Sequence, residues 1–281
     1  VKLNETVLNL IVNDGEVKGV VTNLGEYSCD SVIVATGGLS YPSTGSTGDG
    51  YRMAEKLGHT VTPLKPSLVP LETAEDCAQM MGLSLKNATL SVRDNVKNKI
   101  IFKEMGEMLF THFGVSGPTV LSASAHLKGD SCKLQLDLKP ALDEGKLNER
   151  ILRDMATYKN RAMENALTDL LPRSMIPAVL KMASIPAELQ ANSLTKQQRR
   201  ALLELLKCFP VDVVGKRPVA EAIITSGGIK VSEINPKTME SKKVSGLYFA
   251  GEIIDCDAYT GGFNLQIAWA TGYAAGMAVN L

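Results

Sequence analysis

The chain has 281 residues, of which 44% are hydrophobic and 21% are charged, the mix of an ordinary soluble globular protein. This length suffices for one large domain or roughly two or three small ones, and the composition excludes a disordered chain, a collagen-like repeat and a disulfide mini-protein. Thirty Lys and Arg residues balance thirty Asp and Glu residues, so the chain as a whole lacks the positive charge typical of nucleic-acid-binding proteins.

The cysteines and histidines argue against a metal site. The five cysteines are far apart and odd in number, and no pair has CxxC spacing, so neither a zinc knuckle nor a disulfide framework is predicted. Free thiols are typical of a reducing cytoplasm, where we expect the protein to be located. Only three histidines are present, and HExxH is absent. No metal ligand is therefore predicted.

The hydropathy of the chain predicts no association with a membrane. No apolar run approaches the ~18–20 residues that a membrane helix needs, and no signal peptide is evident. The chain begins with Val1 instead of Met, inside a predicted β region, which indicates a fragment or a processed chain. The sequence gives no oligomeric state.

The first 60 residues are predicted to be α/β. Alternating apolar residues over 6–12, a turn at Asn13-Asp14-Gly15 and a second run over 17–22 predict a β-hairpin. The continuous apolar run 31–35 is typical of a buried parallel strand. A loop of small residues follows it, and a short helix is expected over 51–57.

The middle of the chain changes from strands to helices. Three prolines within residues 63–70 indicate a linker into a second unit. Short β-like runs up to about residue 138 predict a small, mostly antiparallel sheet or barrel, and an apolar helical period over 140–209 predicts three to four helices. Between Lys139 and Arg217, 14 basic residues face 9 acidic ones, a net charge of +5 that is typical of solvated helix faces.

The last part of the chain returns to α/β. Strands are predicted over 222–225 and 247–250, and a long helix rich in Ala and Gly over 262–279. In that helix, small residues at about helical spacing predict tight packing of the helix on a sheet; these are Ala268, Gly272, Ala275 and Gly276. Two α/β segments around a β-then-helical block predict one nucleotide-binding domain with a large insertion.

Three glycine-containing segments are candidates for a ligand site. Two predicted strands end in small residues, at Ala35-Thr36-Gly37-Gly38 and at Gly251-Glu252, where backbone without a Cβ admits phosphates or a ribityl chain. Gly261 and Gly262 open the last helix, whose N-terminus favours negative charge. Alternatives are a plain turn after the first strand and a helix N-cap at Glu252. No G-x-G-x-x-G follows a strand.

The order and spacing of these segments resemble the HI0933-like flavoproteins, also called the YhiN or BaiN group, which are FAD-dependent oxidoreductases. The resemblance covers the chain from about Val7 to its end. Four stretches are its most specific part: ATGGLSYPSTGSTGDGY (35–51), LFTHFGVSGP (109–118), ITSGGIKVSEINPKTMESKK (224–243) and GLYFAGEIIDCDAYTGGFNLQIAWATG (246–272).

The resemblance implies a fold and a division into domains. An α/β, Rossmann-like FAD-binding domain, lacking the N-terminal strand–G-x-G-x-x-G–helix segment that holds the ADP half of FAD in the family, would occupy residues 1–68 and 213–281. An insert over residues 69–212 would interrupt it, with a small β-barrel or sheet over 69–139 and a helical bundle over 140–212.

The resemblance also implies which residues contact FAD. Val7 would meet the adenine through its backbone, and the last helix would bring its N-terminus near the pyrimidine edge of the flavin. The residues expected to line the cofactor are Val7, Ala35, Thr36, Gly37, Gly38, Gly251, Glu252, Gly262, Phe263, Asn264 and Leu265.

Three residues are candidates for acid–base or substrate-orienting roles. His112 lies within a family-like motif and could donate a proton opposite the flavin N5, although a hydrogen-bonded structural histidine is the competing interpretation. Thr225 and Tyr259 could orient a substrate carbonyl, and packing or capping is the alternative for both.

The expected activity is transfer of a hydride through FAD, from NAD(P)H to an unsaturated or carbonyl-containing small molecule. One alternative is a flavin-dependent reductase of uridine in ribosomal RNA, with RNA bound by the basic helical insert. Another is a non-catalytic flavoprotein fragment, because the ADP-binding turn is absent.

Overall fold

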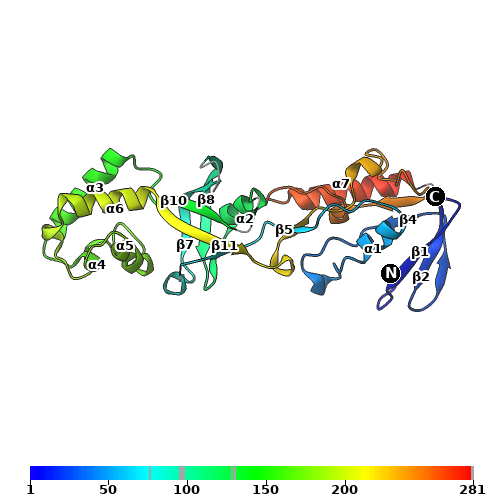
Figure 1. Ribbon diagram of the computed structural model, residues 1–281, viewed down its shortest axis with the longest axis horizontal. Helices are drawn as coiled ribbons and strands as arrows, with labels where there is room; N and C mark the ends of the chain where they lie inside the picture. The colour runs from blue at the N-terminus through cyan, green and yellow to red at the C-terminus, as the bar shows by residue number, and fades with distance from the viewer. Residues whose placement is uncertain (76, 95–98, 128, 130, 280–281) are drawn as a thin grey trace. The chain divides into compact units, whose positions relative to one another are not determined.

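A computed structural model describes residues 1–75, 77–94, 99–127, 129 and 131–279. The chain divides into two compact units, the first formed by Val1–Val69 with Arg217–Leu281 and the second by Pro70–Lys216. Figure 1 shows their elements in chain order. Among the described residues, no helix combines the length and the apolar character needed to span a bilayer.

The first unit contains three small sheets. Strands β1 (Val7–Asn13), β2 (Glu16–Thr22) and β3 (Glu26–Ser28) form an antiparallel sheet, with the predicted Asn13-Asp14-Gly15 turn between the first two. Strand β4 (Val32–Val34) pairs in parallel with β13 (Leu247–Phe249), and β5 (Lys65–Ser67) pairs with β12 (Ile224–Ser226). The helices of this unit are α1 (Asp49–Lys56) and α7 (Phe263–Ala278).

The second unit contains a closed barrel with strand order β10-β11-β6-β9-β8-β7. Strands β10 and β11 alternate between buried and more exposed residues, as the two-residue period of a strand requires. The strands are β6 (Leu71–Thr73), β7 (Ser84–Arg93), β8 (Ile100–Phe110), β9 (Gly114–Ser116), β10 (Cys132–Asp137) and β11 (Phe209–Lys216).

Among the described residues, five α-helices complete the second unit. Helix α2 (Pro118–Ala125) packs on the barrel, and four helices occupy the long connection between β10 and β11 (Figure 1). These are α3 (Glu144–Thr157), α4 (Met163–Ala166), α5 (Ile176–Met182) and α6 (Lys196–Lys207). Helix α6 begins with a capping box in which Thr195 and Gln198 satisfy each other's backbone N–H groups. One continuous hydrophobic core joins the barrel to these helices.

The predicted insert and the second unit differ at their C-terminal boundary. The predicted cut after residue 212 falls inside β11, which pairs with β10 and with β6 as far as Lys216. Residues 209–216 therefore belong to the barrel, although the sequence pattern assigned residues 209–212 to the helical part and 213–216 to the flanking domain. The helical period ends at Lys207, where α6 ends.

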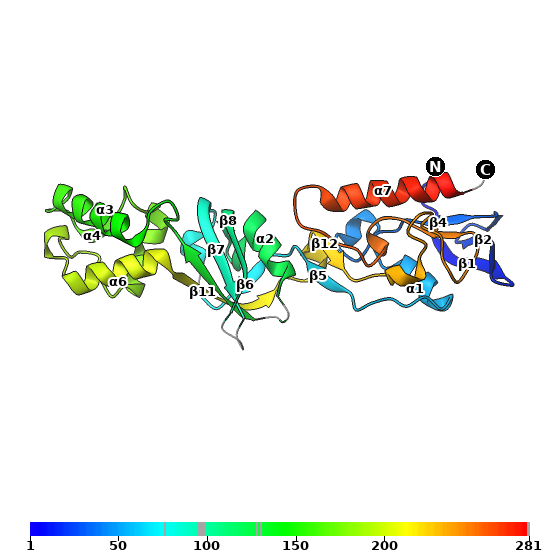
Figure 2. The same ribbon diagram turned by 90° about the horizontal axis from the view of Figure 1, so that it is seen from above.

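Helix α7 packs less closely than its small residues predict. Ala275 is buried and Ala268 lies beside Gly251, but a Cβ placed on Gly272 or on Gly276 would meet no described atom within 4 Å. The predicted tight packing is therefore wrong for these two glycines. Figure 2 shows α7 along one side of the first unit. The large apolar side chains that it exposes are Phe263, Leu265, Trp269, Tyr273 and Met277.

A buried polar cluster joins three segments of the first unit. His59 is 4% exposed, and its Nε2 lies 2.9 Å from the Ser241 hydroxyl while its Nδ1 lies 3.3 Å from a Glu233 oxygen. Burial opposes ionisation of Glu233, but hydrogen bonds from Lys243 and from the amide and hydroxyl of Thr60 outweigh it and lower the pKa of Glu233 to about 2.

This cluster predicts a loss of stability below neutral pH. Burial lowers the pKa of His59 below 6.5, so the folded protein keeps the imidazole neutral where the unfolded chain takes up a proton. The free energy of unfolding should therefore be maximal above pH 6.5 and decrease as the pH falls from 6.5 towards the folded-state pKa. The slope from this one proton is at most ~1.4 kcal/mol per pH unit.

Denaturant unfolding followed by circular dichroism at pH 7.5 and pH 5.5 measures this slope. His59→Gln should reduce it, and the same substitution at the exposed His112 serves as the control. A slope that is identical in wild type and His59→Gln would show that this imidazole does not carry the effect.

Candidate functional site

The parallel pairing of β4 with β13 brings two of the candidate glycine segments together. Val34 is the register partner of Phe249, and the Ala250 amide donates to the Val34 carbonyl at 3.1 Å. The residues that follow both strands therefore leave the sheet side by side, at its carboxyl edge. In open α/β sheets this edge is where ligands bind.

Helix α7 passes beside the second of these strand ends. The Gly251 amide donates to the Thr271 hydroxyl at 2.9 Å, and a Cβ on Gly251 would lie 3.7 Å from that of Ala268. Gly262 lies six to nine residues before these two contacts, about 9–14 Å away along a helix. The site is thus elongated, with the strand ends at one part and the start of α7 at another.

The start of α7 offers backbone N–H groups to a ligand. Gly262, the N-cap, has a φ of 89°, its missing side chain leaves open space, and no side chain caps the helix. Asn264 fixes the preceding loop, because its amide group accepts from the Ala258 N–H at 2.9 Å and donates to the Ala258 carbonyl at 2.8 Å. Phe263 and Leu265 are exposed at this end.

The loop after β4 is held in place by Thr225. Its hydroxyl is buried and accepts hydrogen bonds from the amides of Leu39 at 2.8 Å and Ser40 at 3.1 Å. Glu252 holds the same loop, because one carboxylate oxygen accepts from the Ser40 hydroxyl at 3.0 Å and from the Thr225 amide at 2.6 Å. Both residues thus fix the loop beside the candidate site.

The glycines of this loop serve the protein's own packing. A Cβ on Gly38 would lie 2.4 Å from the Thr225 hydroxyl and 2.7 Å from Glu252, and one on Gly37 would lie 2.7 Å from the Ser46 hydroxyl. Gly38 is buried, so it faces the interior, whereas Ala35 is exposed. The buried hydroxyl oxygen of Thr36 has no hydrogen-bond partner among the described residues.

Tyr51 on α1 contacts the backbone that follows β13. Its buried hydroxyl lies 3.4 Å from the Glu252 carbonyl, and burial raises the pKa of this phenol well above its ordinary value. The phenol therefore stays protonated and can donate to that carbonyl. Neither Tyr51 nor Ser40 was a candidate from sequence, and only the three-dimensional fold brings them to Glu252.

The remaining candidates lie elsewhere. Val7 begins β1 of the separate three-stranded sheet, opposite Thr22. Tyr259 is half exposed in the loop before α7. His112 is exposed in the turn between β8 and β9, with its ring 5.0 Å from that of Phe113, and it belongs to the second unit. The roles expected of these residues stay predictions.

The hydrogen bonds that Thr225 accepts from the loop after β4 predict that Thr225→Val destabilises the first unit. The valine accepts no hydrogen bond, so the Leu39 and Ser40 amides lose their partner at a cost of about 1–3 kcal/mol in the free energy of unfolding. Thr225→Ser keeps the hydroxyl and should retain most of the stability. Chemical denaturation of the wild type and the two variants measures the difference in the free energy of unfolding. Equal stability of the Val and Ser variants would contradict a stabilising role of the Thr225 hydroxyl.

Comparisons with known proteins agree with one another. The family model described as the HI0933-like protein Rossmann domain matches residues 1–278. The chain is 30% identical over 258 residues to a 3-dehydro-bile acid delta(4,6)-reductase of Clostridium scindens, with 90% of this chain and 62% of that protein covered.

Two further relatives share a different name. A ribosomal RNA dihydrouridine synthase of Haemophilus influenzae is 32% identical over 274 residues, covering 96% of this chain and 65% of that protein. A ribosomal RNA dihydrouridine synthase of Escherichia coli is 32% identical over 247 residues, covering 88% of this chain and 60% of that protein. The chain thus spans 60–65% of the length of these curated relatives.

Proposed function

The chain belongs to the HI0933-like family, and from that membership we propose that it forms the larger part of a FAD-dependent oxidoreductase. The observation that carries the proposal is the carboxyl edge of the β4–β13 pair, which continues along α7 to an open, uncapped helix N-terminus. An elongated ligand with phosphates and a planar ring suits such an edge.

The residues present fit FAD in three respects. The Gly262 position faces open space that a Cβ would occupy, so a flat or bulky group can approach the backbone there. The Thr36 hydroxyl is a buried polar group that still needs a partner. The uncapped amides at the start of α7 favour negative charge. Bound FAD would supply hydride transfer through its flavin ring.

The chain's own groups would position the cofactor and the substrate. Thr225 and Glu252 hold the β4 loop in one conformation, which keeps the backbone near Gly37 fixed when a ligand binds. The positive end of α7 would stabilise negative charge at the pyrimidine edge of a reduced flavin. Tyr259 would orient the substrate from its exposed loop, and His112 would donate a proton if it reaches the reacting carbon.

We propose NAD(P)H as the donor and a molecule with a polarised double bond as the acceptor. A hydride from the donor and a proton from a protein group or water would together reduce that bond. The names of the relatives support this class of acceptor, because a delta(4,6)-reductase and a dihydrouridine synthase both describe saturation of a ring double bond. A cytoplasmic location is part of this proposal, because widely separated cysteines without CxxC spacing are typical of a reducing compartment.

The flavin proposal predicts that a side chain at Gly262 weakens FAD binding. A Cβ at position 262 would meet no described atom within 4 Å, and Asn tolerates a positive φ, so Gly262→Asn should leave the fold intact while FAD affinity falls at least tenfold. Gly15→Asn, at another open glycine with positive φ, is the matched control. Flavin absorbance and fluorescence titration, on the protein with any residues that precede Val1 in its gene, measure the affinity.

Anaerobic mixing of the FAD-loaded protein with NADH or NADPH tests the donor. Bleaching of the flavin absorbance by either nucleotide would support the proposal. Absence of flavin reduction by both nucleotides would contradict a pyridine-nucleotide donor. Failure of the protein to bind added FAD would favour the non-catalytic fragment.

Ribosomal RNA is the second candidate substrate. It is favoured by the names of two relatives and by the net charge of +5 between Lys139 and Arg217. Arg153 on α3 and Arg200 on α6 have side chains that are 72% and 81% exposed, and Arg200 also pairs with Glu204 at 2.7 Å. Arg199 donates to Asn148, and Arg161 lies over the ring of Tyr158.

The RNA proposal predicts that Arg153→Glu with Arg200→Glu lowers RNA affinity at least tenfold and flattens its salt dependence, because fewer counterions are released. Lys230→Glu with Lys237→Glu, in the first unit, is the charge-matched control. Binding of a ribosomal RNA fragment, measured at several salt concentrations, gives both quantities. Equal affinity and equal slope in both double variants would leave the small-molecule acceptor as the substrate class.

A further inference from the structure

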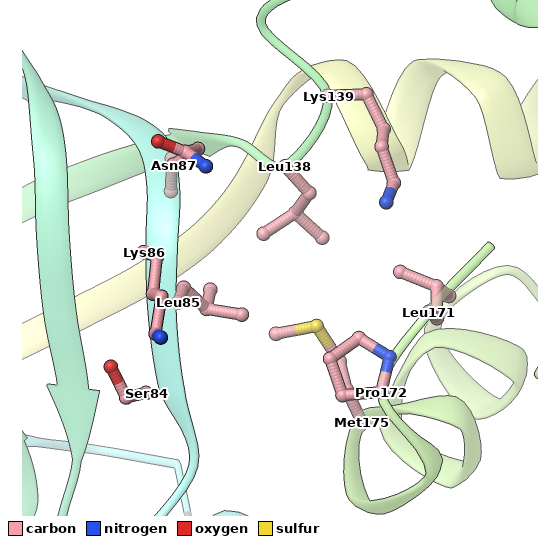
Figure 3. Close-up of a pocket in the computed structure, with 10 residues that line it drawn as sticks. Ser84, Leu85, Lys86, Asn87, Leu138, Lys139, Leu171, Pro172 and Met175 are labelled. Atoms are coloured by element: carbon pink, nitrogen blue, oxygen red, sulfur yellow. The ribbon is translucent and has the colours of Figure 1, made fainter. Parts of the chain in front are cut away.

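A hollow of about 240 Å³ lies within the second unit, where the barrel meets the helices. Figure 3 shows β7 on one side of it, the segment after β10 above it, and the segment that leads into α5 on the other side. The lining residues used below are Leu85, Lys86, Leu138, Lys139, Leu171 and Met175.

A β-bulge shapes the barrel side of this hollow. Leu85 pairs with Met108 and Ala88 pairs with Gly106, so three steps along β7 face two steps along β8. The extra residue falls at Lys86–Asn87, both of which are exposed. Bulges redirect side chains and recur beside functional sites. Here the bulge places Lys86 at the edge of the hollow.

Lys139 stands on the opposite side on a firmly held backbone. Its amide donates to Asp137 at 2.9 Å, and its carbonyl accepts from the Lys207 ammonium at 3.2 Å. The Asp137 carboxylate in turn binds Lys207 at 2.5 Å. Figure 3 shows the Lys139 side chain extending from this backbone towards the hollow. The backbone position of Lys139 is therefore fixed by the protein itself, without a ligand.

The Lys139 ammonium lacks an anionic partner. Among the described residues, neither Lys139 nor Lys86 forms an ion pair. Burial and the nearby Arg150 guanidinium lower the pKa of Lys139, and Arg150 itself is occupied by Asp154 and the Asp169 carbonyl. A half-buried cation beside a second cation is costly unless an anion joins them.

Part of the wall of the hollow is apolar. Leu138, Leu171 and Met175 are buried, and Figure 3 shows Leu138, Leu85 and the Met175 thioether around its centre. The Ser84 hydroxyl at the rim already donates a hydrogen bond to Glu107 at 2.6 Å. Lys86 and Lys139 are the positively charged residues of the lining. At about 30 Å³ per water, the volume equals about eight waters, the size of a small organic acid.

We propose that this hollow binds a small organic carboxylate, with the carboxylate beside the Lys139 ammonium and the hydrocarbon part against Leu85, Leu138, Leu171 and Met175. A lysine ammonium binds carboxylate or phosphate as a point charge, and the apolar walls favour the ligand that carries a hydrocarbon body. The site lies in the second unit and is independent of the proposed flavin site.

Hexanoate is a suitable probe, because its eight heavy atoms match the volume. The protein carries ¹³C-methyl methionine, and the Met175 signal is assigned with Met175→Leu. Hexanoate should shift this signal saturably, while hexanamide, which has the same shape without the charge, should bind at least tenfold more weakly. Inorganic phosphate should also bind more weakly, because it leaves the apolar walls empty.

Substitutions then test the lysines. Lys139→Met should lower hexanoate affinity at least tenfold and raise the Tm of the unliganded protein, since it removes an uncompensated charge and keeps the hydrocarbon stem. Lys86→Met should cause a smaller loss, and Lys133→Met, on an exposed position of β10, should cause none.

Four results would overturn the proposal. Equal binding of hexanamide would make the hollow merely apolar, and equal or tighter binding of inorganic phosphate would make it a phosphate site. Unchanged hexanoate affinity in Lys139→Met, or no Met175 shift at millimolar hexanoate, would exclude a carboxylate site at these lysines.

Discussion

The parallel pairing of β4 with β13 is the constraint on which the first unit depends. The two strands are more than two hundred residues apart in sequence, and their three-residue register aligns Val34 with Phe249. Because the strands run in the same direction, both chain segments leave the sheet at one edge. The β4 loop, the Gly251 turn and α7 are all arranged from that edge.

A second layer of interactions converts this edge into a rigid surface. Glu252 follows β13, Thr225 belongs to β12, and their hydrogen bonds meet at Ser40 in the loop after β4. Three strands from distant parts of the chain are thereby linked by two side chains. Rigidity of this kind suits a cofactor-binding domain, in which geometry must be set before the ligand arrives.

Much of the local structure could be predicted from the sequence. The Asn13-Asp14-Gly15 hairpin, the short apolar strand at β4 and the helical period of α3 and α6 are local signals, and all three appear in the structure. Long-range relations were not accessible. The hydroxyl of Thr225 meets amides 185 and 186 residues away, and the return of β11 to the barrel follows only from its pairing partners.

The prediction of tight packing from the small residues of α7 was wrong at two positions. Glycines in a helix are compatible with close packing and with an uncovered surface, and in α7 the open space beside Gly272 and Gly276 shows the second case. Sequence cannot separate the two, because the difference lies in what stands opposite the helix. Gly37 and Gly38 show the opposite case, since their missing side chains make room for Ser46, Thr225 and Glu252.

The connection between β10 and β11 has a consequence for how this chain can change. Leu136 and Phe209 are register partners, so all four helices of the connection depart from and return to one point of the barrel. In topology the helical segment replaces a hairpin turn. Evolution or protein engineering could therefore shorten, enlarge or exchange it as a cassette, provided that the apolar side chains it covers on the barrel receive a new cover.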